Sequence, residues 1–160
     1  MDNVGAFAKE TIKELRDTIW AMNKTGITIK DLKARIANFI EKAKQSHGGV
    51  RISVIADKNI PDDTSFTGMQ GLNIFRIVQE ATNNALKYAD ASQIDIQISR
   101  VQGTFHFVIS DDGKGFLEED IEPGNGLLNM RKRALELGGE LELNSETGMG
   151  TSVSFKFQHK

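Results

Sequence analysis

Four stretches of the chain carry apolar residues every three or four positions, which is the spacing of a helix with one buried face. These stretches are residues 8–22, 28–46, 74–88 and 127–137. The second opens on Thr28 and Asp31, which have the spacing of a capping box, and His47 with the two glycines after it closes the helix. The pattern therefore predicts four helices.

Elsewhere apolar and polar residues alternate, which predicts strands with one buried face. The alternating stretches are residues 50–56, 94–98, 105–109, 140–144 and 151–157. Short glycine-containing turns separate the second from the third and the fourth from the fifth, so we expect two hairpins. Residues 59–71 hold a proline, two glycines and short polar side chains, and we expect a connection there. This order predicts an α+β fold, a two-layer α/β sandwich with helices on one face of a mixed, largely antiparallel sheet.

The first helix carries a narrow apolar seam in steps of four and three, which is typical of helices that pack on helices. The seam consists of Ala8, Ile12, Leu15, Ile19 and Met22. Two heptads are too short to be stable alone, and Trp20 and Phe7 widen the apolar face beyond what one neighbour needs. We therefore interpret the helix as the end of a longer bundle rather than as a helix docked on the domain. This predicts an N-terminal helical appendage at residues 1–25 and a globular domain at residues 26–160.

Composition narrows the function classes. The chain has 160 residues and a net charge of −2, with 20 Lys and Arg against 22 Asp and Glu. Such a balance gives no positive field to attract nucleic acid or anionic lipid. There is no cysteine, which removes disulfides, zinc–thiolate sites and thiol nucleophiles and fits a reducing compartment. No apolar run reaches the ~18 residues of a membrane span, so we expect no direct membrane contact from this chain.

The third predicted helix carries a polar stripe opposite its apolar face. Arg76, Glu80, Asn84 and Lys87 are separated by four, four and three residues, so their side chains project from one side. An acid, an amide and two cations suit a divalent cation and phosphate. The alternative is a solvated face with ordinary ion pairs, and a pair between Arg76 and Glu80 accounts for Arg76, which we leave out of the predicted site.

Three glycine-rich junctions follow this helix. In Asp111-Asp-Gly113-Lys-Gly115 a strand ends on a carboxylate, which can accept from an adenine amine beside backbone that a flat ligand can approach. Two further junctions have the sequences Gly124-Asn-Gly126 and Gly148-Met-Gly150-Thr151. The former opens a helix at Leu127, where free backbone N–H groups favour a phosphate, and Arg131 lies one turn on. Singly, each junction is more often just a turn or a hinge.

In this order the motifs resemble the nucleotide-binding domain that histidine kinases, gyrase-type topoisomerases, Hsp90 chaperones and MutL proteins share. The resemblance spans roughly residues 66–157. The runs around Glu80, Asn84 and Asp111, and the run Gly126-Leu-Leu-Asn-Met-Arg131, are more similar to sensor histidine kinases whose response regulators are of the LuxR/NarL type. The resemblance implies an ATP-binding catalytic domain at residues 26–160 and the remnant of a dimerisation helix at residues 1–25.

The resemblance also implies roles for single residues, with ATP and Mg²⁺ as the cofactors. Asn84 would ligate Mg²⁺, and Glu80 would orient a metal-bound water or act as a base, an oxygen-rich setting that suits this ion. Asp111 would take the adenine amine. Residues 117–123 would form the lid. The other implied ATP-binding residues are Lys87, Gly113, Gly115, Gly124, Gly126, Leu127, Arg131 and Thr151.

The implied reaction is transfer of the γ-phosphoryl group of MgATP to a histidine. None of His47, His106 and His159 lies on the predicted bundle helix, so the acceptor would be on another polypeptide or segment. The implied partners are a response regulator of the LuxR/NarL type and, in the full-length protein, a second copy of the chain. The implied location is the cytoplasm, including the cytoplasmic part of a membrane-bound sensor. Two alternatives stay open: a nucleotide-binding regulatory or interaction module without transfer, and a serine kinase of the anti-sigma type.

Overall fold

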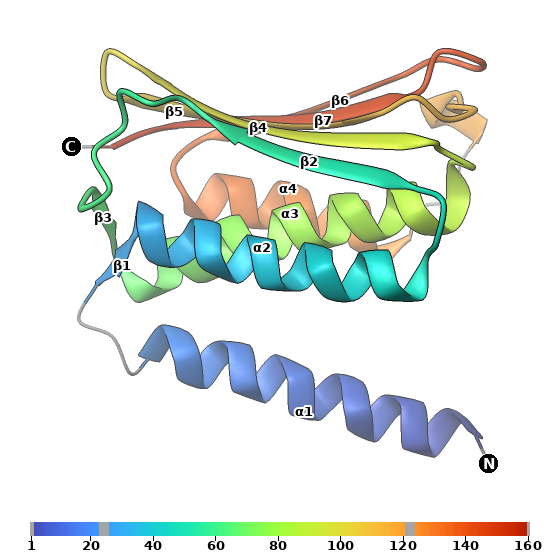
Figure 1. The fold of residues 1–160 in the computed structure, drawn as a ribbon, viewed down its shortest axis with the longest axis horizontal. Helices are drawn as coiled ribbons and strands as arrows, with labels where there is room; N and C mark the ends of the chain where they lie inside the picture. The colour runs from blue at the N-terminus through green and yellow to red at the C-terminus, as the bar shows by residue number, and fades with distance from the viewer. Residues whose placement is uncertain (1, 23–25, 121–123, 160) are drawn as a thin grey trace.

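The computed structural model describes residues 2–22, 26–120 and 124–159, and it has two main layers (Figure 1). One layer is a five-stranded sheet in the order β2-β4-β5-β7-β6. Only β2 and β4 are parallel; the other neighbouring strands are antiparallel. The bounds are β2 Arg51–Ala56, β4 Gln93–Val101, β5 Thr104–Asp111, β6 Glu140–Ser145 and β7 Thr151–Gln158.

Three helices cover one face of this sheet: α2 (Ile29–Ser46), α3 (Gly68–Tyr88) and α4 (Asn125–Glu136). The predicted α+β class and the mixed, largely antiparallel sheet are therefore confirmed. The core lies between the layers, where Ile94, Ile96 and Phe105 are fully buried and the rings of Phe107 and Phe155 stack at 4.9 Å. Because alternate strand residues point to opposite faces, the period-two pattern of the sequence produces this apolar surface directly.

The connection predicted at residues 59–71 is wrong in part. It contains β3 (Ser65–Phe66), which pairs with β1 (Ile27–Thr28), and it contains the first turn of α3. Thr67 and Gln70 form a capping box there. Gly71, which had suggested a loop, lies inside α3 and packs against Ile27: a Cβ at this position would be 2.6 Å from Ile27 Cδ1. Close packing, rather than a turn, requires this glycine.

The hairpin of β4 and β5 is confirmed, and Gln102 and Gly103 at its turn both have positive φ. The capping box of Thr28 and Asp31 is also confirmed at the start of α2. In the segment predicted to be a lid, the 3₁₀ helix η1 (Glu118–Asp120) follows Leu117, and residues 121–123 lie outside the described part.

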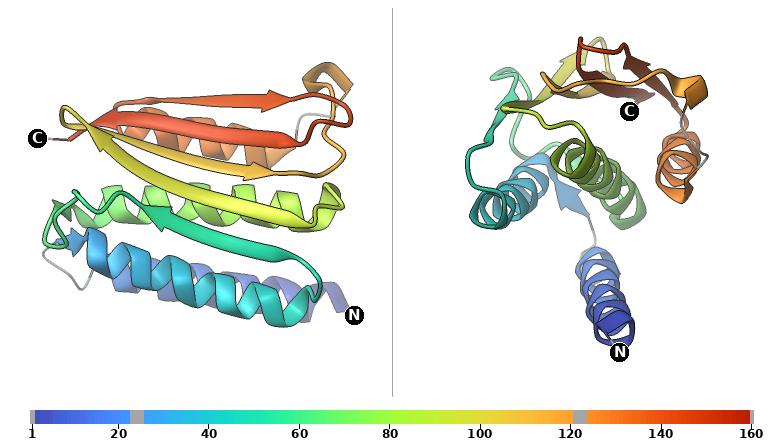
Figure 2. Two further views of the ribbon diagram at one scale, coloured as in Figure 1. Left: turned by 45° about the horizontal axis from the view of Figure 1, so that its top comes forward. Right: turned by 90° about the vertical axis from the view of Figure 1, so that its right-hand side faces the viewer.

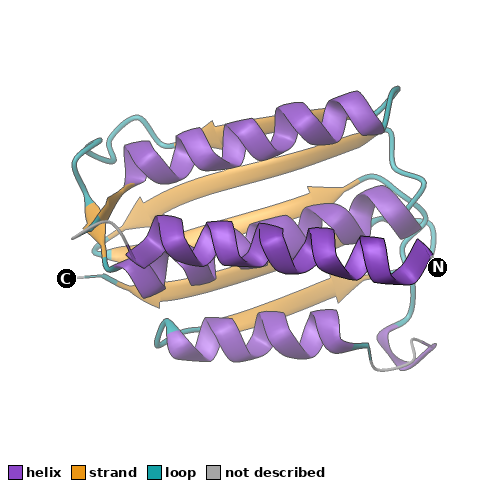
Figure 3. Cartoon of the chain, turned by 90° about the horizontal axis from the view of Figure 1, so that it is seen from below, coloured by secondary structure: helices purple, strands orange, loops and turns teal. Residues whose placement is uncertain are grey.

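Helix α1 (Asp2–Met22) forms a third level beneath α2 and α3, and the views of Figures 2 and 3 place it along α3. Its predicted apolar seam is largely exposed: Ile12, Leu15, Ile19 and Met22 are 50 to 77% exposed. Asp17 and Ala21 are instead buried. Both the seam and a docked face are therefore present on one helix. None of the helices in the described ranges is long and apolar enough to cross a membrane.

Candidate functional site

The predicted motifs meet at one end of the molecule, on the right of Figure 1. The C-terminal half of α3, the end of β5, the start of α4 and the turn between β6 and β7 converge there. Segments far apart in the chain thus form one region, as the order of motifs had suggested.

Glu80 lies against the first turn of α4. A Cβ on Gly126 would be 2.3 Å from Glu80 Oε1, so the carboxylate end of this side chain lies beside Gly126. Asn84 follows one turn later on the same side of α3 and is partly buried, whereas Lys87 is exposed. The structure therefore brings the predicted Glu80 beside the predicted Gly126.

A polar network around the buried Asn73 links α4 to α3. Asn73 is 3% exposed, and its amide donates to Glu136 Oε2 at 3.1 Å and accepts from Arg133 Nη1 at 3.1 Å. Burial lowers the pKa of Arg133 below its usual value, and the nearby positive charge of Arg76 acts in the same direction. The sequence offered no signal for this network, because its members lie on two helices far apart in the chain.

The predicted ion pair between Arg76 and Glu80 is wrong. Arg76 Nη1 lies 3.2 Å from Asp17 Oδ2 of α1 and donates to Gln79 Oε1 at 3.0 Å. The side chain therefore turns toward α1 and leaves the site. Leaving Arg76 out of the predicted ligands agrees with this position, although the expected partner was incorrect.

Asp111 closes the other side of the region at the end of β5. Its Oδ1 accepts from the backbone N–H of Gly113 at 2.9 Å, while a Cβ on Gly113 would be 2.2 Å from the carbonyl oxygen of Ala89. Burial raises the pKa of Asp111, and backbone hydrogen bonds from Gly113 and Thr151 partly offset this effect. The carboxylate is thus partly shielded from solvent and partly open to a ligand.

Two loops beside Asp111 are held together by backbone contacts. Gly148 N donates to the carbonyl of Lys114 at 2.6 Å. Gly115 and Gly150 have φ of 60° and 78°, and a Cβ on either would lie 2.1 Å from a carbonyl oxygen of the neighbouring loop, that of Glu146 or Asp111. These contacts require glycine both for the backbone conformation and for space.

Ser145 also contributes to this part of the site, and no sequence signal marked it. Its Oγ accepts from Phe116 N at 2.9 Å and lies 2.8 Å from Thr151 Oγ1. The serine thereby fixes the predicted Thr151 hydroxyl and the start of the predicted lid.

The N-terminus of α4 begins at a residue that has no side chain to cap it. Its N-cap is Gly124, with extended backbone angles and no side-chain cap hydrogen bond. The helices α2 and α3, by contrast, both begin with complete capping boxes. Within the described part of the chain, the N-cap residue therefore leaves the first-turn N–H groups of α4, including those of Gly126 and Leu127, without a side-chain cap. Together with the helix dipole these groups can hold an anion.

Arg131 lies on the exposed side of α4. Its Nη2 is 2.7 Å from Glu118 Oε1 of η1, so the predicted phosphate-binding arginine has an acidic partner in the lid segment. This pair ties the start of the lid to α4. Residues 121–123 of the lid remain outside the described part.

Oxygen donors for a metal are few. Among the described residues, no group of three or more His, Cys, Asp or Glu side chains comes together to hold a metal ion. Glu80 and Asn84 fit Mg²⁺ nonetheless, because this ion commonly takes one or two protein oxygens and completes its shell with phosphate and water. An ion here would therefore bind together with a nucleotide.

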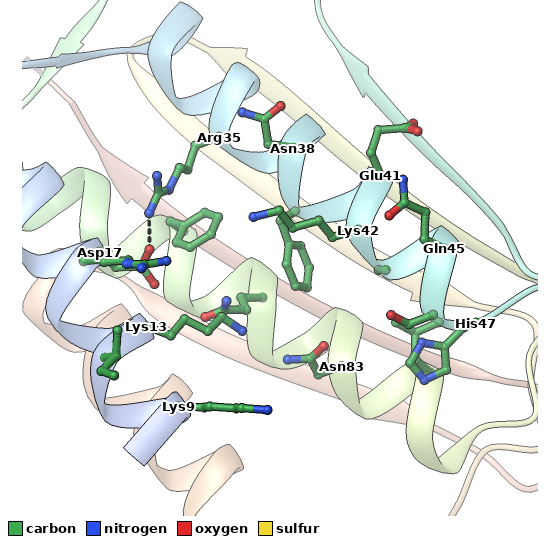
Figure 4. Close-up of a pocket in the computed structure, with 18 residues that line it drawn as sticks. Lys9, Lys13, Asp17, Arg35, Asn38, Glu41, Lys42, Gln45, His47 and Asn83 are labelled. Carbon is green, nitrogen blue, oxygen red and sulfur yellow. Dashed lines mark hydrogen bonds and ion pairs between the residues drawn. The ribbon is translucent and has the colours of Figure 1, made fainter. Parts of the chain in front are cut away.

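The pocket shown in Figure 4 lies on the other flank of α3. It has a volume of about 970 Å³ and is lined from α1, α2 and α3, with Lys9, Lys42, Gln79 and Asn83 among its residues. None of the predicted site residues lines it. Asn83 and Asn84, although adjacent in sequence, thus belong to different surfaces.

We expect nucleotide affinity to depend on the charge of Asp111. Because its pKa is raised, acidification from neutrality should protonate it at a higher pH than an ordinary aspartate and weaken ATP binding. Asp111→Asn should reduce ATP affinity about tenfold, since a charge-assisted hydrogen bond is lost, and should narrow the preference for ATP over GTP. Affinities of both proteins for both nucleotides, measured between pH 7 and about 5, test this. A pH profile and base preference that the substitution leaves unchanged would count against this role.

Comparison with known proteins identifies the domain. Residues 69–160 match the family described as histidine kinase-, DNA gyrase B-, and HSP90-like ATPase. An uncharacterized sensor-like histidine kinase of Chloroflexus aurantiacus is 28% identical over 96% of this chain and 27% of that protein. The sensor protein VraS of Staphylococcus haemolyticus is 29% identical over 92% of this chain and 41% of its own length. The chain thus spans well under half of these relatives.

Solved structures share the fold. The histidine kinase domain of the Erythrobacter litoralis EL346 blue-light activated histidine kinase superposes with a TM-score of 0.73 at 23% identity, covering 92% of this chain and 72% of that chain. The histidine kinase AdeS of Acinetobacter baumannii gives a TM-score of 0.69 at 16% identity, covering 99% and 81%. The family match covers more than half of the sequence and includes every predicted site residue. The chain therefore belongs to the family of histidine kinase-, DNA gyrase B- and HSP90-like ATPases.

Proposed function

We propose that residues 26–160 form the ATP-binding catalytic domain of a two-component sensor histidine kinase, which transfers the γ-phosphoryl group of MgATP to a histidine outside this chain. The observation that carries the proposal is the meeting of Glu80 with the uncapped N-terminus of α4 at Gly126. A carboxylate and a set of free N–H groups there can hold a metal ion and phosphate oxygens side by side. The sensor kinases among the relatives support the same reading.

In this proposal the two ends of the site hold different parts of the nucleotide. Asp111 accepts from the adenine amine, and the glycines at 113 and 115 with Thr151 line the base. Gly124, Gly126 and Leu127 donate backbone N–H groups to phosphate oxygens, with Lys87 and Arg131 as nearby cations. Freeing Arg131 from Glu118 would then accompany closing of the lid over the phosphates.

Asn84 would hold Mg²⁺, and Glu80 would hold one of its waters or take the proton of the attacking imidazole. The ion neutralises phosphate charge, which is a major part of catalysis in this reaction class. Transfer forms a bond from an imidazole nitrogen to the γ-phosphorus and breaks the bond to the β,γ-bridging oxygen, so that ADP leaves.

We also propose that residues 1–25 are the end of a dimerisation bundle. The exposed seam of α1, with Ile12, Leu15 and Ile19 uncovered, supports this division. In the whole protein this bundle would pair with that of a second copy. The phosphohistidine would then pass its phosphoryl group to a response regulator of the LuxR/NarL type in the cytoplasm.

A transfer assay tests the proposal. The chain is mixed with γ-³²P-ATP, Mg²⁺ and a separately expressed dimerisation bundle that carries an acceptor histidine, taken from a sensor kinase relative. Acid-labile, base-stable label on the bundle is expected, and Glu80→Gln should reduce its rate. ATP binding without any label on the bundle would favour the regulatory-module alternative. Acid-stable label on serine of a partner would favour the serine-kinase alternative.

A further inference from the structure

Asp17 is a buried carboxylate that the proposed reaction does not use. It is 3% exposed, although the residues around it on α1, such as Leu15 and Ile19, are more than half exposed. A charge is rarely buried in this way unless it is paired. Its partners come from two other helices.

The two oxygens of Asp17 bridge two arginines. Oδ1 accepts a short hydrogen bond from Arg35 Nη2 of α2, and Oδ2 lies 3.2 Å from Arg76 Nη1 of α3 (Figure 4 shows the pair with Arg35). Arg76 is itself 12% exposed and makes a further contact to the carbonyl of Glu14 at 3.5 Å. We call Asp17, Arg35 and Arg76 the Asp17 clamp.

Aromatic rings support the clamp. The guanidinium of Arg35 lies 5.0 Å from the ring centre of Trp20 and 5.6 Å from that of Phe75. The two rings contact each other edge to face at 6.4 Å. Arg35 is thus held between a ring of α1 and a ring of α3, which fixes the direction from which it meets Asp17.

A close backbone contact lies one turn further along α1. A Cβ on Gly68, the first residue of α3, would be 2.4 Å from the carbonyl oxygen of Ala21. The clamp and this contact are both in the C-terminal part of α1, while residues 3–16 are exposed. Helix α1 therefore packs on the domain through its C-terminal part.

The geometry points to Asp17 as a positioning residue: we propose that its clamp fixes α1 in one orientation on α3, and so sets where the bundle helix stands relative to the nucleotide site. Arg76 lies one turn before Glu80 on α3. The Asp17 clamp therefore contacts the same helix that carries the proposed Mg²⁺ ligands. An acceptor histidine on a bundle continuous with α1 would then approach the phosphates along a path that this orientation defines. The guidance of an acceptor histidine rests on the proposed function, whereas the fixing of α1 by the clamp does not.

Spin-label distances test the orientation without reference to ATP. Because the chain has no cysteine of its own, a spin label reacts only with cysteines that are introduced. We place them at two exposed positions, Glu10→Cys on α1 and Ala37→Cys on α2. The otherwise unchanged chain should give one narrow distance distribution. Asp17→Asn, which removes the charge and keeps the shape, should broaden it roughly twofold or split it. Gly68→Ala should shift or broaden the distribution with the clamp charges intact. The control Glu140→Gln, which removes an exposed acid on β6 of the sheet, should leave the distribution unchanged.

The outcomes separate positioning from folding. The circular dichroism of Asp17→Asn and its affinity for MgATP should stay close to those of the parent, because α1 moves while the domain remains folded. An unchanged distance distribution in Asp17→Asn, or a broad one in the parent, would overturn the proposal. Loss of the fold in Asp17→Asn together with an unshifted Gly68→Ala would overturn it as well. Absence of nucleotide binding in every variant would defeat the proposed function alone.

Discussion

Asn84→Ala should lower the affinity for MgATP by about 100-fold, the upper end of what losing one group of a metal site typically costs. Asn84 lies on the flank of α3 that also carries Glu80, one turn away, facing the start of α4. Without the amide oxygen the ion would lose a protein ligand, and the phosphates would lose the charge that holds them. The measurement is titration calorimetry with ATP in the presence and absence of Mg²⁺.

Asn83→Ala is the matched control. Asn83 is the adjacent residue but lines the pocket on the opposite flank of α3. The affinity of the Asn83→Ala variant for MgATP should therefore match that of the unsubstituted chain. Both substitutions put alanine, the best helix former, inside a helix, and neither should lower stability appreciably. Equal affinities for the two variants would remove Asn84 from the site.

Gly150→Ala should destabilise the domain by about 2 to 4 kcal/mol. Alanine at φ of 78° costs about 1 kcal/mol, and its Cβ would lie 2.1 Å from the carbonyl oxygen of Asp111, which forces backbone to move. Overpacking of this kind adds about 1 to 3 kcal/mol. Such a loss is a large fraction of a typical domain's free energy of unfolding, and urea titration would measure it.

Gly148→Ala separates the two causes in the same turn. Gly148 also has positive φ, 83°, but a Cβ there would meet nothing within 4 Å. Its free energy of unfolding should therefore fall by only about 1 kcal/mol. If both variants lose the same stability, the close approach of the loops at Asp111 is not what requires glycine at position 150.

Periodicity predicted most of the fold, because the buried face of each strand and helix repeats along the local sequence. It failed at residues 65–71, where Gly68 and Gly71 suggested a loop. Those glycines are needed for contact with Ala21 and Ile27, which are distant in sequence. A local pattern cannot distinguish a glycine that makes a turn from one that admits a neighbour.

The candidate site was predicted from the order of its motifs rather than from any single residue. Geometry then added what no local signal carries: Gly126 meets Glu80, Ser145 holds Thr151, and Arg131 pairs with Glu118. The partner of Arg76 was predicted wrongly because an acid four residues away is the obvious candidate on an isolated helix. The actual partner, Asp17, lies on a helix whose docking depends on the tertiary structure.

Equilibrium dialysis of the chain against radiolabelled ATP tests the central claim most directly. The convergence of Glu80, Asn84, Asp111 and the uncapped start of α4 predicts one bound ATP per chain in the presence of Mg²⁺, greatly weakened binding when Mg²⁺ is chelated, and displacement by unlabelled ATP more readily than by GTP. Absence of saturable binding at millimolar nucleotide, about the weak end of the affinity scale, would contradict the assignment of this site to ATP.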